Sequence, residues 1–201
     1  IYNIDSKYIV TATLRRDGSS KFGKNNRWGY FPSASVAWNI KSEPFLENVA
    51  LIEQLKLRVG YGVAGNDNFD SNAYRPVIKP DGNTFDYESG TYVPQYTSKL
   101  NANPDLKWEE NKEYNIGLDW GIFNNKLTGT FEYYKRRTDG LLIKINVDGD
   151  PGYVYPDLWI NAGSFESSGF EANIQYHPYT SKSFNWKTQL SFSTFTQKII
   201  K

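Results

Sequence analysis

Residues 55–63, LKLRVGYGV, alternate between large apolar side chains and polar or small ones at every position. The apolar positions are Leu55, Leu57, Val59, Tyr61 and Val63. Successive side chains of a β-strand point to opposite faces, so this segment has one apolar face as a strand, whereas a helix would scatter the same residues around its axis. Residues 114–122, YNIGLDWGI, repeat the pattern. Both stretches predict strands with one face in apolar surroundings.

Weaker alternation of the same kind occurs elsewhere in the chain. It covers residues 8–15, 33–40, 127–133, 170–176 and 186–192. Together these segments predict an all-β chain of about seven strands, most near the 9–11 residues that a tilted strand needs to cross a bilayer. Between two of them, SEPFLENVALIEQL predicts a brief amphipathic helix that starts near Ser42 or Glu43, with Pro44 at an early position.

The connections between the expected strands differ greatly in length. Residues 66–107 and 138–163 form long links rich in Gly, Pro, Asn, Asp and Tyr, whereas Asn124-Asn125 and HPYTSKSFN form short ones. If the strands are antiparallel, both long links emerge at one end of the sheet and both short ones at the other. Outer-membrane barrels show this asymmetry, with short periplasmic turns and long extracellular loops.

Composition narrows the classes of protein that remain. The chain has 201 residues, a net charge of +1, no Cys and no Met. No apolar run approaches the roughly 18 residues of a membrane helix, and the charge lacks the basic excess of a nucleic-acid-binding protein. The mean hydropathy of -0.62 fits a soluble protein, but barrel strands average out in the same way. The lack of Met predicts a processed chain or a fragment.

A soluble β-sandwich, such as a carbohydrate-binding module, shows similar alternation. Against it stand the grouping of the long links at one end and four glycines on polar strand faces, namely Gly60, Gly62, Gly117 and Gly121. Strand glycines usually mark a sharp bend or the close approach of another backbone. In a barrel, the approaching backbone would be that of a plug inside it. The pattern alone leaves barrel and sandwich open.

Longer motifs carry a resemblance that covers nearly the whole chain. They are LRRDGSSKFGKNNRWGYFPSASVAWNI (14–40), SEPFL (42–46), LKLRVGYGVAGN (55–66), NPDLKWEENKEYNIGLDWGIFNNKLTGTFEYYKRRTDGLL (103–142), NAGSFESSGFEANIQY (161–176) and FNWKTQLSFST (184–194). In this order they resemble SusC/RagA-type TonB-linked outer-membrane transporters. The long links are the divergent parts.

The resemblance implies a bacterial outer-membrane barrel of about 22 strands with a plugged lumen. Residues 1–201 would then form part of the barrel domain, without the plug, the TonB-contacting segment and the final strands. It further implies uptake of oligosaccharides or peptides driven by TonB, a SusD-like lipoprotein lid, no enzymatic activity and no cofactor. A passive porin or a structural barrel is the alternative within the membrane class.

Aromatic residues in the long links are the candidate substrate-binding residues, because flat rings with a polar tip stack on sugars or hold peptide side chains. The residues selected are Tyr74, Tyr87, Tyr92, Tyr155 and Trp159. The alternative is that such rings pack the loops together or contact the lid.

Alternation also predicts which strand residues face the lumen and which face lipid. The expected lumen-facing residues are Arg15, Arg58, Asp119, Glu132 and Glu171, and the expected lipid-facing residues are Leu57, Val59, Leu118 and Trp120. Aromatic residues near strand ends predict girdles at the bilayer interfaces. They are Trp28, Tyr30, Phe31, Trp108, Trp120 and Phe123.

No catalytic or metal-binding constellation stands out. His177, the only histidine, lies beside Pro178 in a short turn, which predicts an exposed turn residue. Two Asx-rich stretches have oxygen ligands at spacings that suit Ca²⁺ but lack the features of an EF-hand loop. They are Asn66, Asp67, Asn68 and Asp70, and then Asp148 and Asp150. Turn formation explains such residues equally well, and the sequence leaves calcium open.

Overall fold

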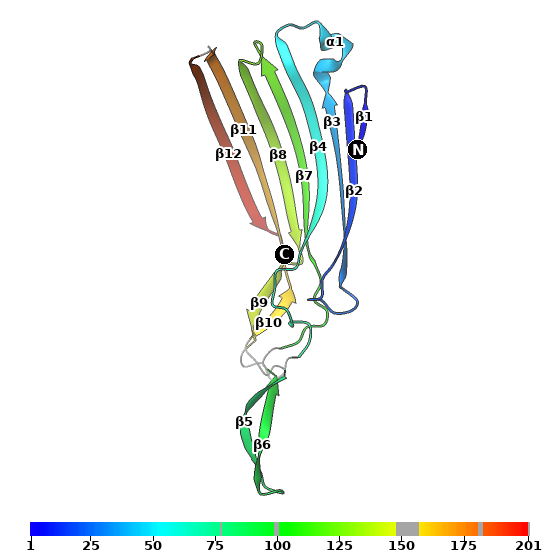
Figure 1. Cartoon of the computed structure of the whole chain (residues 1–201), viewed down its shortest axis with the longest axis vertical. Helices are drawn as coiled ribbons and strands as arrows, with labels where there is room; N and C mark the ends of the chain where they lie inside the picture. The colour runs from blue at the N-terminus through cyan, green and yellow to red at the C-terminus, as the bar shows by residue number, and fades with distance from the viewer. Residues whose placement is uncertain (77, 99–100, 148–156, 181–182, 201) are drawn as a thin grey trace.

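The computed structural model describes residues 1–76, 78–98, 101–147, 157–180 and 183–200. One antiparallel sheet of eight strands dominates it, in the order β1-β2-β3-β4-β7-β8-β11-β12 (Figure 1). The bounds are β1 Tyr2–Ile4, β2 Tyr8–Gly18, β3 Trp28–Asn39, β4 Ile52–Asn66, β7 Glu109–Ile122, β8 Leu127–Asp139, β11 Ser164–Thr180 and β12 Asn185–Ile199. Each later strand of this sheet therefore contains one of the segments that alternation predicted, except that the segment 33–40 ends one residue beyond β3.

The strands extend beyond the segments in which alternation is clear. Strand β4 has 15 residues and β11 has 17, because the pairing with their neighbours continues into polar sequence. Strand β1, which the sequence pattern did not predict, pairs with β2 through Tyr2 and Val10. With 3 residues it is too short to show a period.

The two long links lie at one end of the sheet and the Asn124-Asn125 turn lies at the other, as predicted (Figure 1). The long links also contain strands of their own. The first carries the hairpin β5 Ile78–Asp86 and β6 Thr91–Ser98, and the second carries β9 Leu142–Asn146 and β10 Asp157–Asn161. We call the end with the long links the loop end and the opposite end the turn end.

The two faces of the sheet differ in chemistry, as alternation predicted. On one face, directly paired residues form an apolar row across five strands, consisting of Val36, Val59, Ile116, Tyr133 and Phe170. These side chains remain between 39% and 48% exposed. Within the described ranges, this apolar face has no covering layer like the second sheet of a sandwich. The other face, the polar face, carries Arg58, Asp119, Glu132 and Glu171.

The link between β3 and β4 is less helical than its sequence suggested. It contains the 3₁₀ turn η1 Ile40–Ser42 and the short helix α1 Pro44–Glu47, and Ile52–Asn66 already belongs to β4. Glu43 is the N-cap residue and Pro44 follows at the first helical position, as expected. Among the described residues, no helix is long and apolar enough to cross a membrane.

Candidate functional site

A small apolar core joins the loops at the loop end. Phe22 from the β2–β3 loop packs against Phe69 and Trp108, with ring centroids 4.9 and 5.1 Å apart. Phe22 and Leu106 are fully buried. We call this group the loop core; it comprises Phe22, Phe69, Ala73 and Leu106, with Trp108, Leu142 and Trp159 packed against them. Most of the buried apolar side chains that the structure describes belong to the loop core. These loops therefore form a folded layer at the loop end of the sheet.

Hydrogen bonds tie the two long links to each other within this layer. The side chain of Asn103 donates to the carbonyl of Trp159 at 2.9 Å, and Asn161 Nδ2 donates to the carbonyls of Lys107 and Gly140 at 2.8 and 2.9 Å. The Lys107 N–H donates to Asn161 Oδ1 at 2.9 Å. Because residues far apart in sequence satisfy one another, the long links hold a defined shape where they leave the sheet.

The Asx-rich stretch after β4 serves this layer. Ser19 Oγ donates to Asp67 Oδ2 at 2.7 Å, and the indole N–H of Trp159 donates to Asp70 Oδ2 at 3.0 Å. Asn66 donates to Glu109, whose second oxygen accepts from the Leu142 N–H, both at 3.0 Å. No group of three His, Cys, Asp or Glu side chains that could hold a metal ion occurs in the described ranges. Asp148 and Asp150 lie outside them.

The β5–β6 hairpin projects away from the sheet and from the loop core (Figure 1). Its tip carries an aromatic cluster in which Phe85 packs edge-on against Tyr87 and Tyr92, at 5.1 and 5.3 Å between centroids. Tyr87 is 89% exposed and Tyr92 is 72% exposed. We call Phe85, Tyr87 and Tyr92 the tip cluster.

Asp86 organises the turn beneath the tip cluster. Its carboxylate accepts from Ser89 Oγ at 2.7 Å and from the Glu88 N–H at 3.0 Å. These hydrogen bonds, first that of Ser89, hold the pKa of Asp86 below its usual value. Gly90 closes the turn at a φ of 68°, a conformation that favours glycine.

The structure separates the predicted substrate-binding residues into distinct places. Tyr87 and Tyr92 lie at the far tip of the hairpin, whereas Trp159 packs in the loop core beside Phe69 at 6.0 Å. Tyr74 is half-buried next to the loop core, with the Arg75 guanidinium 5.7 Å from its ring. Tyr155 lies outside the described residues. Among those described, only Tyr87 and Tyr92 present largely exposed rings, and they do not meet Trp159.

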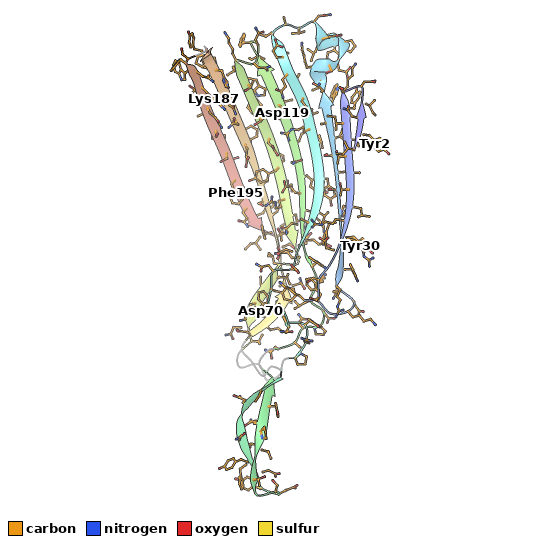
Figure 2. All side chains as sticks on the ribbon, in the orientation of Figure 1. Tyr2, Tyr30, Asp70, Asp119, Lys187 and Phe195 are labelled. Atoms are coloured by element: carbon orange, nitrogen blue, oxygen red, sulfur yellow. The ribbon has the colours of Figure 1, made fainter. Side chains whose placement is uncertain are left out.

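On the polar face, Arg58 links three strands. Its Nε and Nη2 donate to the two oxygens of Asp119, each at 3.0 Å, and Nη2 lies 3.6 Å from Glu132. Glu171 on β11 lies directly across from Glu132. Arg15, nearer the loop end, pairs with Asp17 at 2.8 Å. The five residues predicted to face the lumen therefore share one face. Figure 2 shows Asp119 among the central strands, in the half of the sheet nearer the turn end.

Neighbouring side chains explain three of the four polar-face glycines. A Cβ at Gly117 would lie 2.8 Å from Arg58 Nη2, so the glycine gives the guanidinium room to cross β7. Side chains of Asn115 and Asn125 occupy the corresponding space at Gly60 and Gly121. The sequence suggests that all four glycines leave room for a plug. In the structure, only Gly62 of the four faces open space, because a Cβ there would meet only Ser33, at 3.7 Å.

A shallow depression of about 630 Å³ lies on the sheet around Gly62. Small residues line it, with the ion pair of Arg136 and Glu113 at its rim. The small and polar lining residues are Thr11, Ser33, Ser35, Gly60, Gly62, Asn111 and Asn115.

The residues expected in aromatic girdles differ in exposure. Trp28 and Tyr30 are 56% and 58% exposed near the loop end, and Phe123 is exposed at the turn end. Phe31 is instead buried and packs edge-on against Trp108 at 5.4 Å. Trp108 turns towards the loop core, where it packs against Phe22, and Phe31 packs on Trp108. A short-range sequence pattern does not reveal these contacts.

The family model described as TonB dependent receptor-like, beta-barrel, matches residues 1–199. The TonB-dependent receptor SusC of Bacteroides thetaiotaomicron is 39% identical over 188 residues, which cover 92% of this chain and 18% of that protein. The chain belongs to the TonB-dependent receptor β-barrel family. Members of this family, such as SusC, are outer-membrane proteins, so the chain is an outer-membrane β-barrel segment.

Other TonB-dependent receptors agree with this assignment. The TonB-dependent receptor P3 of Formosa agariphila is 36% identical over 208 residues, covering 100% of this chain and 20% of that protein. The RagAB peptide importer in its 'closed-closed' state superposes with a TM-score of 0.86 at 27% identity, covering 97% of this chain and 21% of that chain. The chain thus spans about a fifth of the length of each of these two proteins.

Proposed function

We propose that this chain is part of the barrel of a TonB-dependent outer-membrane importer that takes up oligosaccharides or peptides. The observation that carries the proposal is the exposed apolar row from Val36 to Phe170, because a soluble sandwich would cover that face and a membrane barrel presents it to lipid. The similarity to SusC and to the RagAB peptide importer supports import. Transport rather than catalysis fits this family.

In this proposal the apolar face contacts lipid and the polar face lines the lumen. Arg58, Asp119 and Glu132 would then lie in a polar interior, where their hydrogen bonds compensate for lost water. The plug and the TonB-contacting segment would belong to other parts of the full-length receptor, and residues 1–201 to its barrel domain.

The loop end would form part of the extracellular mouth. The loop core gives the long links a fixed base, and the β5–β6 hairpin extends from that base beyond the sheet. A two-stranded hairpin is only marginally stable alone, and exposed tyrosines are typical of protein interfaces. We assign Tyr87 and Tyr92 to contacts with a SusD-like lipoprotein lid or with substrate held under it. Tyr74 and Tyr155 remain proposed substrate contacts, and Trp159 supports the loops from within.

The test uses the full-length receptor with Tyr87 and Tyr92 both replaced by Ala. Lid association or ligand affinity should fall at least tenfold, about 1.4 kcal/mol, while heat-modifiable migration on gels stays normal. The matched control is Tyr2→Ala, which removes another exposed ring from the edge strand β1, far from the hairpin. Unchanged lid association and unchanged ligand affinity would remove the hairpin from the mouth. Ligand uptake that persists without TonB would instead contradict the importer and favour a passive porin.

A further inference from the structure

The apolar face changes character at the loop end. Beyond Tyr114 and Tyr133, the same face of β7, β8, β11 and β12 carries charged side chains in place of apolar ones. Lys112, Arg137, Glu166 and Lys198 are directly paired across these strands, and Glu110 pairs with Asp139 in the next row. With Lys135 these residues form what we call the outer charged band.

Ion pairs hold the band together. Lys112 Nζ lies 3.0 Å from Glu110 and 3.2 Å from Asp139, and Arg137 Nε lies 2.7 Å from Asp139. Glu166 accepts from Lys135 at 2.9 Å and from Lys198 at 3.3 Å. Each carboxylate thus places one or two cations on the surface of the sheet.

The band keeps an excess of exposed positive charge. Its four basic side chains outnumber its three carboxylates, and Glu166 is mostly covered, with 13% of its side chain exposed. The side chains of Lys135, Arg137 and Lys198 are 47%, 49% and 66% exposed. Arg137 donates to Asp139 through its Nε.

The position of the band matches a membrane interface. The ring pair of Tyr61 and Tyr114, at 4.6 Å, lies on the same face, next to Lys112 on the side nearer the turn end. On β2 and β3 the same face carries Arg16 stacked on Trp28 and Tyr30, at 4.1 and 5.5 Å. Aromatic rings followed by basic residues are typical of the level at which acyl chains give way to headgroups.

We propose that the outer charged band binds the anionic phosphate headgroups of the outer lipid leaflet. Guanidinium and ammonium groups donate charge-assisted hydrogen bonds to phosphate oxygens, and the carboxylates hold these groups ready at the surface. The inference rests on the proposed assignment of the apolar face to lipid.

The test measures lipid selectivity of the full-length receptor in phosphatidylcholine vesicles that contain spin-labelled phosphatidylglycerol or spin-labelled phosphatidylcholine. The wild type should immobilise the anionic lipid preferentially. Replacing Lys112, Lys135 and Arg137 with Gln should lower the preference, by about fivefold for each basic residue lost at an anionic surface. Replacing Glu110 and Glu166 with Gln should raise it, because the cations lose their competing partners.

Arg136→Gln is the matched control. Arg136 is next to Arg137 on β8 but lies on the polar face, paired with Glu113. Its loss should leave lipid selectivity unchanged. Equal selectivity of the wild type and the triple variant, or an equal drop in Arg136→Gln, would overturn the proposal. If the triple variant fails to fold, the single variant Arg137→Gln tests the proposal. Its preference for the anionic lipid should fall by about fivefold.

A nitroxide at Leu118 tests the lipid-facing orientation of the apolar face separately from lipid binding by the outer charged band. Leu118 lies in the middle of the apolar face, paired with Leu57 and Phe131. A label there that collides with oxygen dissolved in lipid supports the orientation, whereas one that collides with a water-soluble quencher contradicts the proposed function itself. A lipid-facing label without anionic selectivity would overturn only the charged band.

Discussion

Arg58 on β4 and Asp119 on β7 form two parallel hydrogen bonds, Nε to Oδ2 and Nη2 to Oδ1, each 3.0 Å long. The residue directly opposite Arg58 is Gly117, not Asp119, so the guanidinium reaches its partner diagonally across a position that has no side chain. Two-point pairing of this kind fixes direction as well as distance. The Arg58–Asp119 pair therefore helps to fix the register of β4 against β7 on the polar face.

This relationship predicts opposite outcomes for two glycines. Gly117→Ala places a Cβ 2.8 Å from Arg58 Nη2 and should destabilise the sheet by about 1 kcal/mol, because the pair must shift. Gly62→Ala meets only Ser33 at 3.7 Å and should be neutral or stabilising by up to about 1 kcal/mol, since alanine restricts the unfolded chain. Urea titration of the full-length receptor in vesicles measures both. A larger loss in Gly62→Ala would contradict the explanation.

The assignment of faces predicts that adjacent residues of β11 respond differently to a charge. Ala172 lies on the apolar face, opposite Phe131 and Phe192, and Asn173 lies on the polar face, opposite Thr130 and Ser191. Ala172→Arg should cost about 2–4 kcal/mol near the bilayer midplane. Asn173→Arg should cost well under half of that, because its side chain stays in polar surroundings. Similar losses in refolding titrations would show that the faces are misassigned.

The sequence predicts a substrate contact at Trp159, whereas the position of Trp159 in the structure predicts a supporting role. Its ring packs beside Phe69 and its indole N–H bonds to Asp70. Trp159→Ala should loosen the loop core and speed tryptic cleavage after Lys107 at least fivefold, about 1 kcal/mol of local stability. Tyr87→Ala should leave this cleavage rate at the wild-type value. Equal rates in all three proteins would place Trp159 outside the loop core.

At the turn end, Glu43 predicts a dependence on pH. Its carboxylate accepts from the Tyr8 hydroxyl at 2.7 Å and from the Trp38 indole N–H at 3.0 Å. These bonds, first that of Tyr8, lower the pKa of Glu43, opposed in part by burial. The stabilisation is therefore complete above the usual carboxyl pKa and is lost as pH falls through the lowered folded-state pKa.

The protection factors of the β2–β3 amides near Tyr8, which correct for the slower intrinsic exchange at lower pH, should accordingly fall on acidification in the wild type. Glu43→Gln should show the lower protection factors already at neutral pH and little further change. Glu47→Gln, an exposed neighbour on α1, should behave like the wild type. A pH response that survives in Glu43→Gln would assign it to another group.

The main sheet could be predicted from the sequence because its information is local. Alternation within LKLRVGYGV and YNIGLDWGI reports a face that must meet apolar surroundings, and the difference in link length reports which ends coincide. The diagonal reach of Arg58 over Gly117 could not be read in this way, since it depends on the register between two strands.

The loop end was harder to predict for a physical reason. Phe22 and Phe69 are far apart in sequence, and neither belongs to a periodic segment, yet their contact organises the loop core. The hairpin β5–β6 is interrupted by Pro80 and Pro94, which hides its strand character. Aromatic composition therefore could not separate Trp159, inside the core, from Tyr87, at the tip.

The orientation of the sheet in the outer membrane is tested most directly by labelling single cysteines in intact cells. The chain has no Cys of its own, so Tyr87→Cys and Lys126→Cys each introduce one reactive site in a full-length receptor free of other reactive thiols. Tyr87 lies at the tip of the hairpin and Lys126 in the exposed turn at the opposite end. A membrane-impermeant maleimide should label Tyr87→Cys in intact cells and Lys126→Cys only after the outer membrane is permeabilised. Labelling of Lys126→Cys in intact cells, with Tyr87→Cys protected, would contradict this orientation of the sheet.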